Sequence, residues 1–103
     1  MQPIAFDKTS LLEKLRLHNS EIRSYGVKSL GLFGSFVRNT ATEKSDIDLL
    51  VDFEPNQKTF DNFMDLSFFL EDLFGRKIEM VTPQSLNKYI GPHILMEVEN
   101  VRL

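Results

Sequence analysis

Several residue types that would point to particular functions are absent or scarce in this sequence. Its 103 residues include no cysteine and no tryptophan. Without cysteine, disulfide bonds and zinc–thiolate sites are excluded, and the composition is that of a reducing compartment, so we expect a cytoplasmic protein. The 12 basic residues are outnumbered by 15 acidic ones, which gives a net charge of −3. Because surfaces that bind nucleic acid broadly are normally basic, we expect no direct nucleic-acid binding.

Long hydrophobic runs are missing as well. No apolar stretch approaches the roughly 20 residues that a transmembrane helix requires, so no association with a membrane is expected. The opening sequence MQPIAFDKTS lacks both the basic region and the long apolar region of a signal peptide. A chain of this length can bury one modest hydrophobic core, which predicts a single domain over residues 1–103.

The order of helix and strand patterns predicts an α/β (α+β) domain, a small mixed sheet of three to four strands covered by helices. A capping box at Ser10 and Glu13 predicts the start of a first helix, which Asn19 and Ser20 interrupt and Gly26 ends. Strands are predicted over residues 28–33, 47–53, 77–81 and 101–103. Further helices are predicted over residues 60–74 and 83–90, the second ended by Gly91-Pro92, with another turn or two over 93–98.

Two aspartates stand at the beginning of the apolar segment 47–53. In a strand, residues i and i+2 point to the same face, so Asp46 and Asp48 project together, about 6.6 Å apart, while Ile47 points away. Parallel carboxylates repel each other unless a cation lies between them, and Mg²⁺ is suited to one or two carboxylates plus water and phosphate oxygens. This motif alone is a weak signal, because a turn residue at Asp46 and an edge polar residue at Asp48 would also explain it.

Gly34 and Ser35 follow the predicted strand 28–33, and ten residues separate them from Asp46. Glycine lets the backbone approach a ligand closely, and backbone N–H groups with a serine hydroxyl can hold phosphate oxygens. The spacing therefore predicts that phosphates and their metal meet at one end of the sheet.

Glu79 lies in the middle of the predicted strand 77–81, where glutamate is uncommon. If this strand neighbours strand 47–53, Glu79 can join Asp46 and Asp48. Three acids around two metal ions, roughly 3.5–4 Å apart, form the arrangement used for in-line phosphoryl and nucleotidyl transfer.

The compound motif of Gly34-Ser35, ten residues and then Asp46-x-Asp48 resembles the signature of the polymerase-beta-like nucleotidyltransferase superfamily. Together with Arg38, the segments SDIDLLVDF and GRKIEMVTPQSL are similar to the minimal nucleotidyltransferases, the small MNT proteins. The similarity extends over nearly the whole chain, from the strand before Gly34 to the C-terminus.

This resemblance implies roles for the matching residues in a reaction that uses ATP. Two Mg²⁺ ions would be bound by Asp46, Asp48 and Glu79, and Glu79 would also help to activate the attacking hydroxyl. The nucleoside triphosphate would be held by Gly34, Ser35 and Arg38, the arginine touching phosphates.

Two positions depart from the family pattern. Glutamate at position 79 replaces the usual aspartate and is one methylene longer, which alters a geometry to which Mg²⁺ is sensitive. Asn39 stands where glycine is frequent, a mild change because asparagine tolerates a left-handed backbone.

The resemblance also implies a biological role. MNT proteins are similar to antitoxins paired with a helical HEPN-type ribonuclease toxin, and some transfer AMP from ATP to a tyrosine of that toxin. A chain of this length leaves no room for a second, substrate-holding domain, so we expect the acceptor to come from another protein or from a second subunit. Transfer to a small molecule fits poorly for the same reason.

A second hypothesis is a catalytically idle binding module that neutralises its partner by contact. The replacement at Glu79 favours it, as does an apolar line of Phe60, Met64 and Phe68 at spacing i, i+4, i+8 on helix 60–74, beside the stripe expected to face the sheet. The alternative for this line is that the C-terminal segment covers it.

Overall fold

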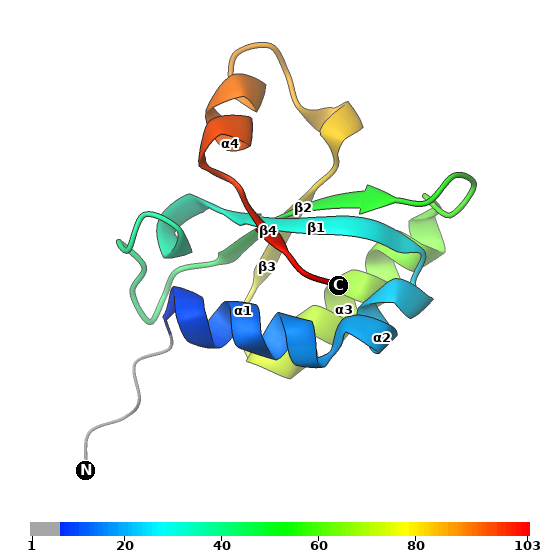
Figure 1. Cartoon of the computed structure of the whole chain (residues 1–103), viewed down its shortest axis with the longest axis horizontal. Helices are drawn as coiled ribbons and strands as arrows, with labels where there is room; N and C mark the ends of the chain where they lie inside the picture. Colours follow the sequence, from blue (N-terminus) through cyan, green and yellow to red (C-terminus); the bar gives the residue numbers. More distant parts are fainter. Residues whose placement is uncertain (1–6) are drawn as a thin grey trace.

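A four-stranded mixed sheet lies at the centre of the computed structural model, which describes residues 7–103 (Figure 1). The α-helices are α1 (Lys8–Leu17), α2 (Asn19–Ser24), α3 (Phe60–Phe74) and α4 (Gly91–Glu97). The strands are β1 (Val27–Phe33), β2 (Ile47–Phe53), β3 (Ile78–Val81) and β4 (Glu99–Val101). Single 3₁₀ turns, η1 (Gly34–Phe36) and η2 (Pro83–Ser85), follow β1 and β3. The predicted fold class is confirmed.

The strand order is β3-β2-β1-β4. Strand β1 pairs antiparallel with β2 and with β4, whereas β2 and β3 run parallel. Strand β2, which carries Asp48 and follows directly after Asp46, is therefore the neighbour of β3, and the register places Asp48 directly opposite Glu79.

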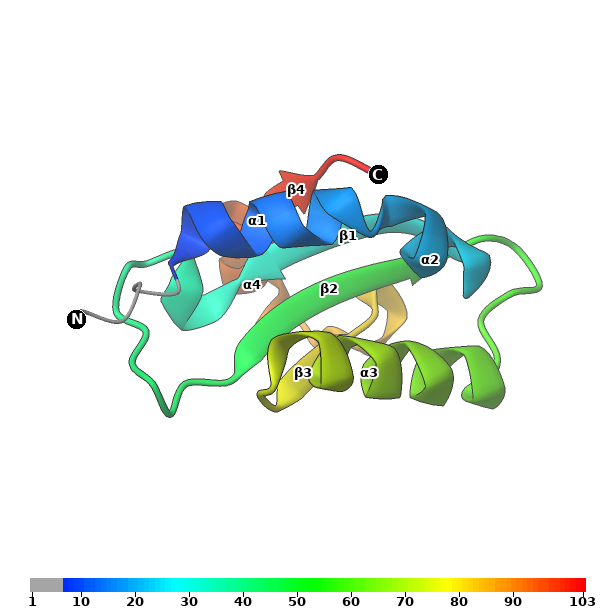
Figure 2. The ribbon, with the colours of Figure 1, turned by 90° about the horizontal axis from the view of Figure 1, so that it is seen from below.

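Successive side chains of β2 point to opposite faces of the sheet, and the two faces differ in burial. Ile47, Leu49 and Val51 are fully buried in the core that α1, α2 and α3 cover, while Asp48 on the opposite face is only half-buried. Figures 1 and 2 show these three helices on one side of the sheet and α4 on the other. The predicted strand thus carries core residues on one face and a carboxylate on the other, the side on which α4 lies.

The helix α3 agrees with its prediction at both ends. Thr59 caps its first turn by accepting the N–H of Asn62, and Gly75 ends it in a left-handed conformation at φ 64°. Leu66 and Leu70 are buried, so the predicted core-facing stripe is correct. No helix among residues 7–103 has the length and apolar character to cross a membrane.

The first helix begins three residues earlier than predicted. Asp7, and not Ser10, caps α1, because the Asp7 carboxylate accepts the N–H of Ser10 at 2.9 Å. The predicted interruption is confirmed, since α1 ends at Leu17 and α2 starts at Asn19.

The predicted helix over residues 83–90 is wrong. Thr82 and Ser85 cap each other and close a single 3₁₀ turn, after which Leu86 is extended. Gly91-Pro92 was expected to end a helix and instead begins α4. Proline is tolerated there because the first N–H groups of a helix have no acceptor within it. The last strand lies at Glu99–Val101 and not at 101–103.

Candidate active site

Gly34 occupies the turn where β1 leaves the sheet, next to Asp48. Phe33 pairs with Asp48 across the two strands, so the following residue crosses above that carboxylate. Gly34 has φ +79°, and a Cβ placed on it would clash with the Asp48 side chain, whose Cγ would be 2.8 Å away. Glycine is needed here both for the backbone conformation and for the space that Asp48 fills.

Asp48 lies in a crowded negative environment. Its pKa is raised from the usual 3.8 to about 6, chiefly by burial and then by the nearby negative charges of Glu79 and Asp46. The positive charge of Arg38 lowers the pKa of Asp48 and so offsets part of this rise. The three predicted acids are therefore close enough for their charges to interact.

The chemistry of this group suits Mg²⁺. All three side chains offer carboxylate oxygens, the ligands that this ion prefers, and their repulsion is what a divalent cation would relieve. Within residues 7–103, no three acidic or histidine side chains stand together in a ligating arrangement, and Glu79 is exposed. Two aspartates with water and phosphate oxygens would match the usual coordination of Mg²⁺, and Asp46, Asp48 and Glu79 as metal ligands all stay predictions.

A cavity of about 300 Å³ opens beside Asp48, between the end of β1 and α4. Its lining consists of Phe33, Gly34, Arg38, Asp48, Ile90, His93, Ile94 and Glu97. Three of the predicted site residues, Gly34, Arg38 and Asp48, are thus brought together around one space. Ser35 is half-buried in η1 next to Gly34, but it does not line this cavity, and neither do Asp46 and Glu79.

Glu97, at the last position of α4, was not predicted to belong to the site. Its Oε2 accepts the N–H of Gly34 at 2.7 Å, and Oε1 and Oε2 lie 2.9 and 3.1 Å from Nη1 of Arg38. No local pattern indicates this contact, because Gly34 and Glu97 are 63 residues apart in the sequence.

Arg76 is a second residue that sequence reasoning missed. Its Nη1 donates to the backbone oxygens of Thr42, Glu43 and Ser45 at 3.1, 3.3 and 2.8 Å. These carbonyls belong to the loop that leads into Asp46. One guanidinium on the segment before β3 therefore fixes the approach to the first aspartate.

Asn39 adopts the left-handed backbone expected of it, with φ 60°. It ends the turn that follows η1, a position whose left-handed backbone asparagine tolerates, so glycine is not required there.

With this geometry established, comparison with known proteins is informative. A family model described as the nucleotidyltransferase domain matches residues 12–102. The chain belongs to this family. Protein adenylyltransferase MntA of Thermococcus cleftensis is 41% identical to this nucleotidyltransferase over 85 residues, which cover 82% of this chain and 85% of that protein. A protein of Methanocaldococcus jannaschii assigned as a protein adenylyltransferase is 36% identical over 93 residues, 88% of this chain and 90% of its own length.

Solved structures agree with this assignment. One assigned as a minimal nucleotidyltransferase has a TM-score of 0.79 and 29% identity, covering 94% of this chain and 98% of that one. A toxin–antitoxin crystal structure with AMP-PNP has a TM-score of 0.65 at 19% identity, over 94% of this chain and 73% of that one, and at this identity the likeness concerns the fold. The resemblance inferred from the motifs is confirmed, and the protein is an enzyme of the nucleotidyltransferase class.

Two further surfaces of this nucleotidyltransferase lie outside the carboxylate site. Phe60 and Phe68 on α3 are 77% and 59% exposed, and Met64 between them is half-buried. The described part of the C-terminal segment therefore leaves both phenylalanines accessible, and the predicted apolar line is separate from the core.

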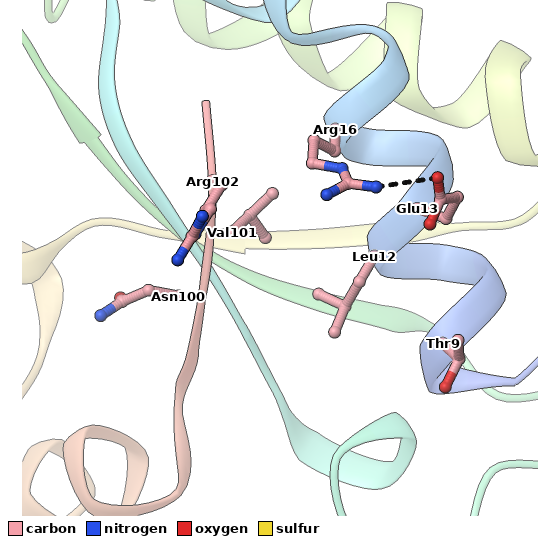
Figure 3. Close-up of a pocket in the computed structure, with 7 residues that line it drawn as sticks. All are labelled: Thr9, Leu12, Glu13, Arg16, Asn100, Val101 and Arg102. Carbon is pink, nitrogen blue, oxygen red and sulfur yellow. Dashed lines mark hydrogen bonds and ion pairs between the residues drawn. The ribbon is translucent and has the colours of Figure 1, made fainter.

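A second cavity, of about 260 Å³, lies between α1 and β4 (Figure 3). Its lining comprises Thr9, Leu12, Glu13, Arg16, Asn100, Val101 and Arg102. Figure 3 shows Arg16 turned toward Glu13, with which it forms an ion pair at 2.9 Å. This cavity shares no lining residue with the one at Asp48, so it lies apart from the predicted site residues.

Proposed function

We propose that this nucleotidyltransferase is a Mg²⁺-dependent protein adenylyltransferase that transfers AMP from ATP to a tyrosine hydroxyl of a helical HEPN-type toxin and so acts as an antitoxin. The observation that carries the proposal is the convergence of the Asp48 carboxylate, the Gly34 turn and Arg38 on one cavity. The relatives named as protein adenylyltransferases, and the similar fold of a toxin–antitoxin structure with AMP-PNP, support it.

In this reaction the acceptor oxygen attacks the α-phosphorus of ATP, the bond to pyrophosphate breaks, and the hydroxyl proton is released. Mg²⁺, when bound, lowers the pKa of the acceptor hydroxyl and neutralises the triphosphate and the departing pyrophosphate. Asp46 and Asp48 would hold the metal, with Glu79 as the third carboxylate. Asp48 is ionised at neutral pH because its pKa of about 6 lies below 7.

The phosphate oxygens would be held by the turn at Gly34 and Ser35 and by the guanidinium of Arg38. Arg38 lines the cavity with its side chain 57% exposed, so it is accessible to an entering nucleotide. A planar guanidinium that donates several N–H bonds is suited to phosphate oxygens.

The proposal is tested by incubating the protein with radiolabelled ATP, Mg²⁺ and the candidate toxin, and measuring label and mass added to the toxin. We expect a mass increase of one or more AMP groups and its loss in Asp48→Asn. The matched control is Asp52→Asn, on the same strand and face but opposite Ser29, away from the cavity. Full labelling by Asp48→Asn would refute the mechanism.

The alternative is neutralisation by contact alone, and the exposure of Phe60 and Phe68 favours it. In that case Asp48→Asn would neutralise the toxin as well as the wild type does, whereas Phe68→Glu would abolish complex formation. Leu17→Glu on α1 is the control, because Leu17 is equally apolar and 73% exposed but lies on another helix.

A further inference from the structure

The groups assigned to the triphosphate already have an anionic partner within the chain. The Gly34 N–H and the Arg38 Nη1 both donate to the carboxylate of Glu97, at distances of 2.7 to 3.1 Å. A carboxylate and a phosphate present the same kind of acceptor, negatively charged oxygens. Glu97 therefore occupies the place that phosphate oxygens would take at the turn.

We propose that Glu97 is a built-in competitor of the triphosphate, which must leave the Gly34 N–H and Arg38 before the nucleotide binds fully. This inference rests on the proposed function and adds a residue that controls nucleotide affinity. A backbone amide has a single hydrogen, so the Gly34 N–H cannot serve Glu97 and a phosphate oxygen at full strength together. Two anions at one guanidinium would also repel each other.

The structure indicates how the exchange takes place. Glu97 is the last residue of α4, and its side chain is 24% exposed, so it has solvent on one side. The backbone after it is fixed, because Val98 packs directly over Gly31 and β4 is paired with β1. Rotation of the Glu97 side chain, with α4 in place, is therefore the movement that the surroundings allow.

Removing the competitor should strengthen nucleotide binding. Isothermal titration with AMP-PNP and Mg²⁺ is carried out without the toxin, so that no acceptor for AMP is present and the affinity is measured without turnover. We expect Glu97→Ala to bind about tenfold more tightly than wild type, since a charge-assisted contact no longer has to be broken. Glu97→Gln, which keeps the size and one acceptor oxygen but loses the charge, should lie between them.

The matched control is Glu99→Gln, which removes a carboxylate two residues later whose partner is Lys8 at 3.0 Å, and its affinity should equal that of the wild type. A second readout is the ¹⁵N–¹H resonance of Gly34. We expect it to move on Glu97→Ala, and to move in wild type on addition of AMP-PNP, because both events remove the carboxylate from that amide.

The outcomes separate the two proposals. If wild type binds AMP-PNP and Glu97→Ala binds it equally or more weakly, Glu97 does not compete with the triphosphate. A weaker affinity would instead identify Glu97 as a residue that positions Arg38. If neither wild type nor any variant binds AMP-PNP, the proposed function is wrong, and the proposal that Glu97 competes with the nucleotide fails with it.

Discussion

Replacing Asp48 with asparagine is expected to stabilise the fold at neutral pH while removing its activity. The pKa of this carboxyl is raised to about 6 in the folded protein, chiefly by burial and then by Glu79 and Asp46. A raised carboxyl pKa means that the folded state binds a proton more readily than the unfolded state does. Between pH 3.8 and about 6, ionisation of Asp48 therefore lowers the free energy of unfolding progressively as the pH rises. Above about pH 6 the whole cost of keeping this carboxylate charged in the folded state remains.

The size of the penalty follows from the pKa. A rise from 3.8 to about 6 corresponds to a ceiling of about 3 kcal/mol, at about 1.36 kcal/mol for each pKa unit. Because Asp48 is half-buried, solvent screening reduces this to about 1–2 kcal/mol. Asparagine is nearly the same shape and carries no charge, so Asp48→Asn should recover that amount. For a domain of this size each kcal/mol raises the melting temperature by about 4–8 °C.

The assay is thermal and urea unfolding of wild type and Asp48→Asn in metal-free buffer, from pH 4 to pH 8. The stability difference should be small at pH 4, grow up to about pH 6 and then level off. Asp52→Asn serves as the control for loss of a carboxylate on the same face of β2.

Two results would refute the reasoning. One is an Asp48→Asn variant that is less stable than wild type at pH 7.5, which would mean that the carboxylate is held by favourable contacts. The other is a gain in stability that does not change with pH, which would mean that ionisation is not its source.

Three further predictions follow from contacts around the site. Gly34→Ala should lower the free energy of unfolding, measured by denaturant titration, by more than twice the roughly 1 kcal/mol expected for Gly75→Ala. Both glycines have positive φ, but only Gly34 faces the Asp48 side chain, so equal losses would contradict this. Mg²⁺ at about ten times its Kd should stabilise wild type by about 1.4 kcal/mol in thermal unfolding and leave Asp48→Asn unchanged; equal stabilisation of both would place the metal elsewhere. Arg76→Lys should lower the free energy of unfolding by about 1–2 kcal/mol and slow AMP transfer. An ammonium cannot reproduce the three carbonyl contacts that hold the loop before Asp46. An unchanged rate of AMP transfer would exclude this positioning role.

Local patterns predicted the elements that depend on near neighbours. The bounds of α3 follow from Thr59, Gly75 and an apolar stripe, all within one segment. Strand β2 was predicted at its observed bounds because a near-continuous apolar run can be recognised without knowing the strands that pair with it. The sequence pattern predicts Ser10 as the cap of the first helix, whereas Asp7 accepts the bond, because both residue types can cap and only the folded chain distinguishes them.

The helix predicted over residues 83–90 is wrong for a physical reason, whereas the helical turns predicted over 93–98 largely coincide with α4. Pro83 and Pro92 both suit a first helical turn, and the sequence does not state which turn will continue. Packing decides: Gly91 is buried against Leu86, which places α4 above the end of β1.

The sequence by itself determined the family, the strand that carries Asp48 and begins just after Asp46, and the glycine turn near them, because spacing along one short segment fixes these features. Only the tertiary structure decided that Asp48 faces Glu79 across a parallel pair, that its pKa rises, and that Glu97 binds the Gly34 amide and Arg38. Those properties arise from burial and from contacts between residues up to 63 positions apart, which no local pattern encodes.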